Sequence, residues 1–387
     1  MDVDSSTVGV EEEFLLADPR TGAPTAKNDA VARTAGDLGL DLQLELTRCQ
    51  IETNTGVHTR TGDLAQQLRD LRRGVASCAE MNDARLLAVA IPPTIPLHYP
   101  VTDTPRYRRI ADGFGMLAQE QGLCGCHVHV AVPDRETAVQ VSNYLRPWLP
   151  LFLALTANSA IYRGAETGYK SWRNILWRRW PSAGPPPYFR CADDYDDLVA
   201  MMLSSGIMLD ERMVYWDVRR SITYPTVEIR VSDVPATVAE TTLLATLVRA
   251  TVMMARQSLD EGRTAPAVAA EMLRAAYWKA ARSGIDGDAV APMDGRVLPA
   301  RDLLAELVEH VEPALKELGD REFVADTIAA VLERGNGAMR QLRAFRAGGD
   351  DVAAVIAELS EATLEGCALP EEPPLGFGEA GAGSPLR

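Results

Sequence analysis

Apolar and polar residues alternate in several short stretches of the first 235 residues, which is the pattern of strands with one buried face. The alternation predicts strands over 8–16, 42–46, 126–132, 215–218 and 226–232, and a continuous apolar run predicts a buried strand over 86–91. Leucines at helical spacing predict a helix over 61–81, and Asp134 is placed to begin another that ends near residue 145.

After residue 237 the apolar period changes from two to about 3.6 residues, and helices are predicted near 237–260, 266–282, 298–318 and 321–346. Thr237 and Glu240 match a capping box at the start of the first of these helices. Strands followed by helices favour an α+β fold over a doubly wound parallel sheet. We expect one domain over residues 1–365, and the Pro/Gly-rich composition of residues 366–387 predicts a disordered tail.

The middle of the chain is rich in tryptophan and arginine and ends in three consecutive prolines at 185–187. Stacked prolines exclude a regular helix or a central strand, so residues 172–187 are predicted to form a long loop. Trp172, Trp177 and Trp180 argue that this loop is ordered.

Charge and cysteine content narrow the class of protein. The chain carries 39 Lys+Arg against 54 Asp+Glu, a net charge of −15, which disfavours nucleic acid and anionic membranes as partners. The apolar stretch at 148–155 falls short of the roughly 20 residues of a membrane span. The first residues do not resemble a secretory signal, and six cysteines without CxxC spacing are typical of reduced thiols. A cytoplasmic protein is therefore expected.

Four stretches place ionisable side chains on the face opposite their apolar residues. These faces carry Glu11 and Glu13 in the first strand, Glu52 in residues 51–55, His127 and His129 over 126–132, and Glu228 with Arg230 over 226–232. Glu12 faces the apolar side by the same alternation and is left outside the site. Taken singly, such a face is most often solvated, the histidines are more often satisfied polar groups than ligands, and Glu228 with Arg230 is an ordinary ion pair.

Together the four stretches suggest a metal site. If the strands are neighbours, five side chains converge on one face: Glu11, Glu13, Glu52, His127 and Glu228. So many carboxylates repel one another unless a divalent cation lies between them, and carboxylate ligands favour Mg²⁺ or Mn²⁺ over zinc. Magnesium in such sites commonly serves a nucleotide phosphate, and Arg230 beside it would steady a transferred phosphoryl group.

Five motifs that follow one another in order closely resemble the carboxylate–amine ligase family, also called glutamate–cysteine ligase type 2. They are GVEEEF at 9–14, ETNT at 52–55, CGCHVHV at 124–130, LWRRWP at 176–181 and PTVEIRVSD at 225–233. The resemblance implies a glutamine-synthetase-like fold, in which a curved, mostly antiparallel sheet cradles ATP and metal and helices pack outside. It also implies ATP-dependent amide formation between a carboxylate, typically the γ-carboxylate of glutamate, and an amine, typically that of cysteine. A homodimer is the expected assembly.

The resemblance assigns roles to individual residues. It implies a metal site formed by Glu11, Glu13, Glu52, His127 and Glu228, with catalytic roles for Glu228 and Arg230. It implies nucleotide contacts for His127, His129 and Arg230. Arg173 and Arg178 are candidates for binding polyphosphate or a substrate carboxylate, because guanidinium forks suit both. Solvated charges on a loop packed by its tryptophans are the alternative for these two arginines.

The implied chemistry passes through an acyl phosphate, because a carboxylate is too poor an electrophile to react with an amine directly. The chain has no Walker-type GxxxxGK[ST] loop, so metals and the sheet would have to hold the nucleotide. Two alternatives remain open. One is an inactive relative that binds a nucleotide or an amino acid. The other is a metal-dependent amidohydrolase, which needs further histidines, and only His58, His98 and His310 remain.

Overall fold

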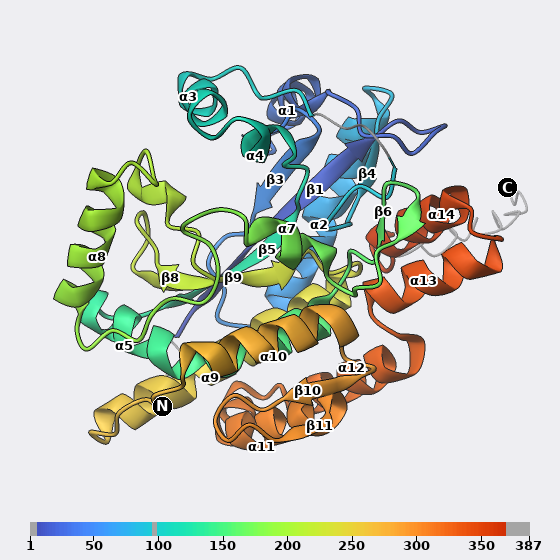
Figure 1. Ribbon diagram of the computed structural model, residues 1–387. Helices are drawn as coiled ribbons and strands as arrows, with labels where there is room; N and C mark the ends of the chain where they lie inside the picture. The colour runs from blue at the N-terminus through green and yellow to red at the C-terminus, as the bar shows by residue number, and fades with distance from the viewer. Residues whose placement is uncertain (1–5, 95–98, 369–387) are drawn as a thin grey trace, which may run out of the picture.

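A seven-stranded sheet lies at the centre of the computed structural model, which describes residues 6–94 and 99–368 (Figure 1). The strand order is β2-β3-β1-β5-β9-β8, and β4 pairs with the end of β1 beyond the part that β5 covers. All strand pairs in this sheet are antiparallel. The α+β class with a mostly antiparallel sheet is therefore confirmed.

The strands of this sheet are β1 (Val8–Ala17), β2 (Leu42–Leu44), β3 (Gln50–Asn54), β4 (Arg85–Leu87), β5 (Gly125–Ala131), β8 (Val218–Arg220) and β9 (Thr226–Asp233). Two hairpins lie apart from it, β6 (Ile161–Tyr162) with β7 (Ala165–Glu166) and β10 (Asp288–Val290) with β11 (Val297–Pro299).

The helices are α1 (Asn28–Asp37), α2 (Thr61–Glu80), α3 (Pro105–Phe114), α4 (Met116–Gln119), α5 (Arg135–Leu145), α6 (Leu149–Thr156), α7 (Trp172–Trp177), α8 (Ala192–Ser204), α9 (Val238–Asp260), α10 (Ala270–Ser283), α11 (Ala300–Leu318), α12 (Arg321–Arg334), α13 (Gly337–Ala347) and α14 (Val352–Thr363), with a 3₁₀ turn at Glu211–Met213.

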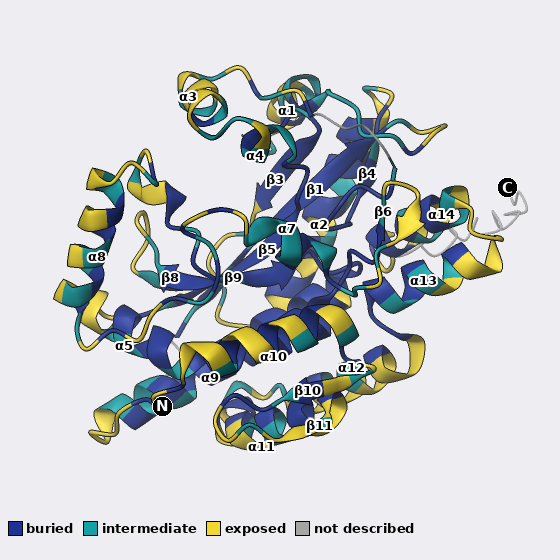
Figure 2. Cartoon of the chain, in the orientation of Figure 1, coloured by how far each residue is buried: buried dark blue, intermediate teal, exposed yellow. Residues whose placement is uncertain are grey.

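The apolar face of the sheet forms the main core with helices α2, α5, α6 and α9. Val10 of β1, Val128 of β5 and Ile229 of β9 are buried there together with much of α9. The sheet and α9 are largely buried, whereas the outer faces of α8, α10 and α11 are exposed (Figure 2). The opposite face of the sheet, which carries the ionisable side chains, is therefore the one left for a site.

Helix α9 begins with the predicted capping box, because the Thr237 hydroxyl accepts from the Glu240 amide and the Glu240 carboxylate accepts from the Thr237 amide. Of the helices within the described ranges, α9 is the one long and apolar enough to cross a membrane, judged by length and composition. In this structure 89% of its most apolar window is buried inside the protein.

Several boundaries differ from those predicted. Residues 172–177 form the short helix α7, which Ser171 caps, so the expected loop begins only after it. The prolines at 185–187 lie too far along the chain to prevent this helical turn. The helix expected over 321–346 is two helices, because Gly335 has a φ of 83° and Asn336 caps α13. The strand expected over 86–91 ends at Leu87.

The C-terminal region contains one unpredicted helix, α14, which packs against α13 and β4 through Val355, Ile356 and Leu359. Cys367 is also buried, although it falls within the stretch predicted as a tail. Residues 369–387, the rest of that predicted tail, lie outside the described residues. The single-domain boundary at residue 365 stays a prediction.

Candidate active site

The register of the antiparallel pairs brings the ionisable faces of four strands together. Glu11 of β1 lies opposite His127 of β5, and Glu13 lies opposite Glu52 of β3. On the other side of β5, His129 lies opposite Glu228 of β9. Because directly opposed residues in neighbouring strands share a face of the sheet, these side chains gather on the face away from the main core.

A β-bulge lies beside Arg230. Two steps along β5, from Cys126 to Val128, are matched by three along β9, from Ser232 to Ile229. The extra residue in β9 bends the strand where Arg230 emerges, and bulges of this kind re-aim side chains next to active sites. Here the Arg230 Nη1 atom lies 3.3 Å from the His127 Nδ1 atom.

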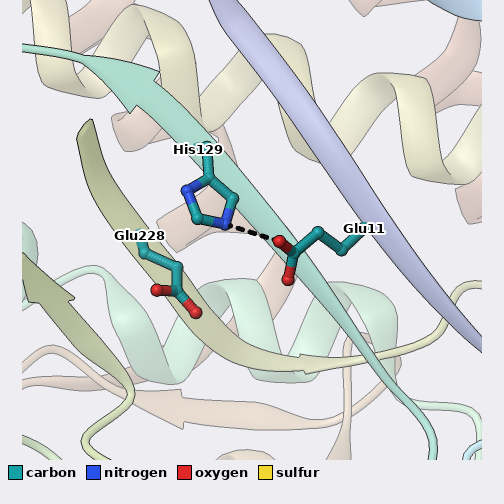
Figure 3. A group of neighbouring side chains, drawn as sticks. All are labelled: Glu11, His129 and Glu228. Atoms are coloured by element: carbon teal, nitrogen blue, oxygen red, sulfur yellow. Dashed lines mark ion pairs between the residues drawn. The ribbon is translucent and has the colours of Figure 1, made fainter. Parts of the chain in front are cut away.

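Glu11 is held by both histidines. Its Oε2 atom lies 2.9 Å from His127 Nδ1, and its Oε1 atom lies 3.2 Å from His129 Nε2. Figure 3 shows Glu11, His129 and Glu228 pointing toward one another from β1, β5 and β9. Burial alone would raise the pKa of Glu11, but its contacts with the two histidines outweigh that effect and hold its pKa below the ordinary value. Glu11 is therefore an anion.

His127 is neutral in this environment. Its side chain is 3% exposed, and burial together with the nearby positive charge of Arg230 lowers its pKa. A neutral imidazole can bind a metal or donate one hydrogen bond without adding to the positive charge of the site. His129 Nδ1 contacts the Thr226 hydroxyl at 2.9 Å, which fixes that ring at the edge of the cluster.

Glu228 is paired with two arginines. Arg219 of β8 grips it with both ends of its guanidinium, Nε to Oε2 at 2.9 Å and Nη2 to Oε1 at 3.1 Å, and Arg230 contacts Oε1 as well. Burial alone would raise the pKa of Glu228. The positive charges of Arg219 and Arg230 outweigh that effect and hold the pKa well below its ordinary value. Glu228 therefore orients Arg230, besides being close enough to Glu11 and His129 to share a cation.

Glu13, Glu45 and Glu52 form a crowded group of carboxylates, with one oxygen from each within 4.8 Å of the others. Burial and the negative charge of Glu13 raise the pKa of Glu45 to about 8. Burial and the charges of Glu45 and Glu11 raise the pKa of Glu52 well above its ordinary value. Two further groups of this size are present among the described residues, Glu11–His129–Glu228 and Glu11–Glu52–His127. Hard oxygen ligands crowded in this way fit Mg²⁺ or Mn²⁺.

These residues line a cavity of about 390 Å³. Aromatic and basic side chains form much of the rest of its wall: Arg106, Tyr107, Arg173, Trp177, Trp180, Arg212 and Tyr215. The loop between β8 and β9 forms another part of its rim, with Ile222 44% and Tyr224 58% exposed. The Tyr224 ring meets the His129 ring edge-on, with centroids 6.0 Å apart. The cavity thus has an acidic floor, a mixed aromatic and basic wall, and an exposed apolar rim.

Of the two candidate arginines, Arg173 lines the cavity and Arg178 does not. The Arg173 side chain is 4% exposed and lies so close to Gly125 that a Cβ there would come within 2.3 Å of its Nη2 atom. Arg178 instead lies over the Tyr277 ring, 5.7 Å from its centroid. Because α7 is helical, residues five apart project about 140° from each other, so these two arginines take different directions.

The other described histidines lie apart from the cavity. His58 contacts Gln67, and His310 stacks on Trp148 with centroids 5.6 Å apart. His98 lies outside the described residues. Neither His58 nor His310 therefore joins His127 and His129, as a metal-dependent amidohydrolase would require.

Two residues of the cluster were missed in the sequence analysis. Glu45 lies one residue beyond the end of β2, and Arg219 lies in β8. The signal for Glu45 was present, because Gln43 and Glu45 alternate with the leucines at 42, 44 and 46. Arg219 could have been noticed by the same alternation, although nothing in the sequence shows that β8 pairs with β9.

The chain matches known proteins over nearly its whole length. The sequence pattern described as glutamate–cysteine ligase family 2 matches residues 7–358. A protein from Nocardia farcinica named "Putative glutamate--cysteine ligase 2-1" is 76% identical over 377 residues, which cover 97% of this chain and 98% of that protein.

This chain belongs to glutamate–cysteine ligase family 2. The family resemblance and the enzyme class expected from the motifs, an ATP-dependent ligase of the glutamate–cysteine type, are confirmed.

Solved structures support the fold of this glutamate–cysteine ligase family 2 member. The glutamate–cysteine ligase of Francisella tularensis, solved in complex with AMP, superposes with a TM-score of 0.67 at 14% identity, over 94% of this chain and 89% of that one. A bifunctional glutathione synthetase from Pasteurella multocida gives the same TM-score and identity, and this chain spans about half of its length, 53%. At this identity the likeness concerns the fold alone.

Proposed function

We propose that the protein joins the γ-carboxylate of glutamate to the amine of cysteine, or of a related amino compound, at the cost of ATP. The observation that carries this proposal is the convergence of five carboxylates, two histidines and Arg230 on one face of the sheet, around a cavity of about 390 Å³. Membership in glutamate–cysteine ligase family 2 supports the choice of substrates.

Glu11, Glu13, Glu45, Glu52, His127 and Glu228 are the residues that would hold a divalent cation. When bound, Mg²⁺ or Mn²⁺ neutralises the polyphosphate charge that would otherwise be repelled by these carboxylates. The donor set fits the ion, because the cluster consists of oxygen ligands with one or two imidazoles and contains no thiolate.

In this proposal Arg230 stabilises the transferred phosphoryl group. In the first step an oxygen of the γ-carboxylate attacks the γ-phosphorus of ATP, the bond from that phosphorus to the β–γ bridging oxygen breaks, and ADP departs. Charge builds on the phosphoryl oxygens, and a guanidinium that is already oriented by Glu228 stabilises it without reorganising. Arg173, buried in the same wall, is the second candidate for this contact.

In the second step the amine nitrogen attacks the carbonyl carbon of the acyl phosphate. The bond from that carbon to the phosphate oxygen breaks, phosphate leaves with the electron pair, and the nitrogen loses a proton to give the amide. The aromatic wall of Tyr107, Trp177 and Tyr215 helps to exclude water, which would otherwise hydrolyse the acyl phosphate.

The test is ADP release by the purified protein with Mg-ATP and glutamate, with and without cysteine and a panel of other amines, followed by mass spectrometry. We expect amine-dependent ADP together with the condensed product. Glutamate labelled with ¹⁸O in its γ-carboxylate should pass one label to phosphate, which reports the acyl phosphate directly. Failure to bind ATP in the presence of Mg²⁺ or Mn²⁺ would contradict the proposal.

Arg230→Lys is the matched variant for this assay, because lysine keeps the charge and loses the fork. We expect it to lower kcat at least tenfold. Arg178→Lys, which makes the same exchange outside the cavity, should leave kcat within about twofold of the wild type.

A further inference from the structure

Glu12 lies between two cavity carboxylates in β1 but faces the opposite side of the sheet. There it meets Arg72 of α2, with Oε1 to Nη2 at 2.6 Å and Oε2 to Nε at 3.1 Å. Both side chains are 0% exposed. Strand β1 therefore carries Glu11 and Glu13 toward the cavity and a buried ion pair at the residue between them.

The guanidinium of Arg72 also ties β1 to segments far away in the sequence. Its remaining hydrogen bonds go to the carbonyl oxygens of Pro235 at 3.0 Å, Ala236 at 2.9 Å and Thr363 at 3.2 Å, and to the Thr241 hydroxyl at 3.2 Å. The Thr241 hydroxyl in turn donates to Glu12 at 2.7 Å. One side chain thus connects β1 with the start of α9 and the end of α14.

Stability alone does not explain an ion pair at this place. Two charges lose their hydration when they are buried, and well-packed apolar residues of similar size often stabilise a core as well or better. Breaking such a pair, however, leaves a charge buried without a partner, so the strand cannot leave this position easily. What the pair supplies is a fixed geometry.

We propose that the Glu12–Arg72 pair positions the cavity carboxylates of β1. When they are ionised to bind a cation, the crowded carboxylates of Glu11, Glu13 and Glu52 repel one another on the cavity side of the sheet. The ion pair holds β1 from the other side and so keeps Glu11 and Glu13 at the separation from their neighbouring ligands at which each can share a cation with them. This inference rests on the proposed function in so far as these carboxylates are taken to bind a divalent cation.

The test is Mn²⁺ binding by the purified full-length protein without nucleotide, measured by calorimetry or by electron paramagnetic resonance. Glu12→Gln keeps the shape of the side chain and removes its charge. At a temperature at which the variant is fully folded, we expect the Kd for Mn²⁺ to rise at least fivefold. This readout is independent of turnover.

Glu240→Gln is the matched control. Glu240 forms another buried ion pair, with Arg340 at 2.8 Å, between α9 and α13 and outside the cavity. Loss of the Glu240–Arg340 ion pair should lower the unfolding midpoint but leave the Kd for Mn²⁺ within twofold of the wild-type value. If Glu12→Gln does not fold, Thr241→Val decides the matter, because it removes one hydrogen bond to Glu12 without leaving a buried charge. It should weaken Mn²⁺ binding in the same direction but less.

The outcomes separate the two proposals. Suppose that Glu12→Gln, or Thr241→Val if Glu12→Gln does not fold, binds Mn²⁺ as tightly as the wild type and loses only stability. The positioning role is then wrong and the proposed metal site stands. If the wild-type protein itself binds no Mn²⁺, both the metal site and the positioning role are overturned.

Discussion

Asp217 is a buried acid immediately before β8, and its backbone carbonyl accepts a hydrogen bond from the amide of Arg230. Burial, opposed in part by the charges of nearby arginines, raises its pKa from 3.8 to about 6. The folded protein therefore binds this proton more tightly than the unfolded chain does. The resulting stabilisation is complete below about pH 4 and is lost as the pH rises through 6.

We therefore expect Asp217→Asn to raise the free energy of unfolding at pH 8 by roughly 2–3 kcal/mol, the equivalent of about two pKa units. At pH 4 the variant and the wild type should be equally stable. Urea unfolding at both pH values checks this. Asp103→Asn, at a side chain that is 82% exposed, is the control and should change neither value. Equal effects of Asp217→Asn at both pH values would contradict the prediction.

Glu45 is the acid of the cluster that lies outside the family motifs quoted above, so its substitution is an informative test. Removing one carboxylate from the Glu13–Glu45–Glu52 group should weaken Mn²⁺ binding roughly tenfold or more. The test variant is Glu45→Gln and the control is Glu120→Gln. In the wild type the Glu120 carboxylate pairs with Arg179 outside the cavity. Calorimetric titration of both variants gives the two affinities. An unchanged affinity in Glu45→Gln would remove this residue from the site.

At the scale of elements, the β8–β9 loop leaves apolar surface open at the rim of the cavity. Tyr224 is more than half exposed beside His129, and the neighbouring cavity-side residue of β1, Gly9, has no side chain. A Cβ at Gly9 would make only ordinary contacts with the chain, so glycine leaves free space there. An exposed aromatic ring beside free space can stack on a flat ligand ring. In the proposed reaction the adenine of ATP is such a ring, and we expect it to stack on Tyr224.

Tyr224→Ala should therefore weaken ATP binding about tenfold, since stacking of a base on an aromatic ring contributes about 1–3 kcal/mol. Binding of inorganic tripolyphosphate should not change, because it has no base. Tyr224→Phe keeps the ring and should bind ATP like the wild type. Competition with a fluorescent ATP analogue measures all three. Equal weakening of ATP and tripolyphosphate would place Tyr224 against the phosphates instead.

Alternation within each strand predicted which side chains point to the same face, and the pairing of β1, β3, β5 and β9 brings Glu11, Glu13, His127 and Glu228 together on one face of the sheet. Period-two patterns are local, so the sequence could not show the order of strands across the sheet. For that reason Arg219, which depends on the β8–β9 pairing, was missed. The position of Arg178 outside the cavity was not anticipated, because α7, six residues long and too short to produce a periodic signal, separates its direction from that of Arg173.

At the scale of the whole molecule, α14, the last helix of the described residues, supports β1, the first strand. Helix α14 buries Val355, Ile356 and Leu359, and its final residue, Thr363, accepts from Arg72 and from the amide of Ala88. Burying three such apolar side chains contributes about 5–8 kcal/mol, which is comparable to the stability of an ordinary domain. The N-terminal strand and the C-terminal helix therefore depend on each other.

Two truncations test this dependence. Ending the chain after Gly349 removes α14 and should give protein that is largely unfolded or insoluble. Ending it after Ala368 removes residues 369–387 of the predicted tail and keeps α14, and should leave the unfolding midpoint within about 2 °C of the full-length value. Circular dichroism melts of the two proteins decide the outcome. A stable, cooperative melt of the shorter chain would show that α14 is dispensable.

The alternation of core and cavity residues also limits the changes in length that the chain can tolerate. One residue inserted into β1 between Val10 and Glu11, with Val8 and Val10 kept in register, would turn Glu11 and Glu13 toward the core and Glu12 toward the cavity, while every residue type stayed the same. A point substitution in these strands changes one side chain on one face. An insertion or deletion there exchanges the side chains that face the core with those that face the cavity. Over evolutionary time, changes in length should therefore accumulate in the connecting loops, and the four strands that carry the cluster should keep their lengths.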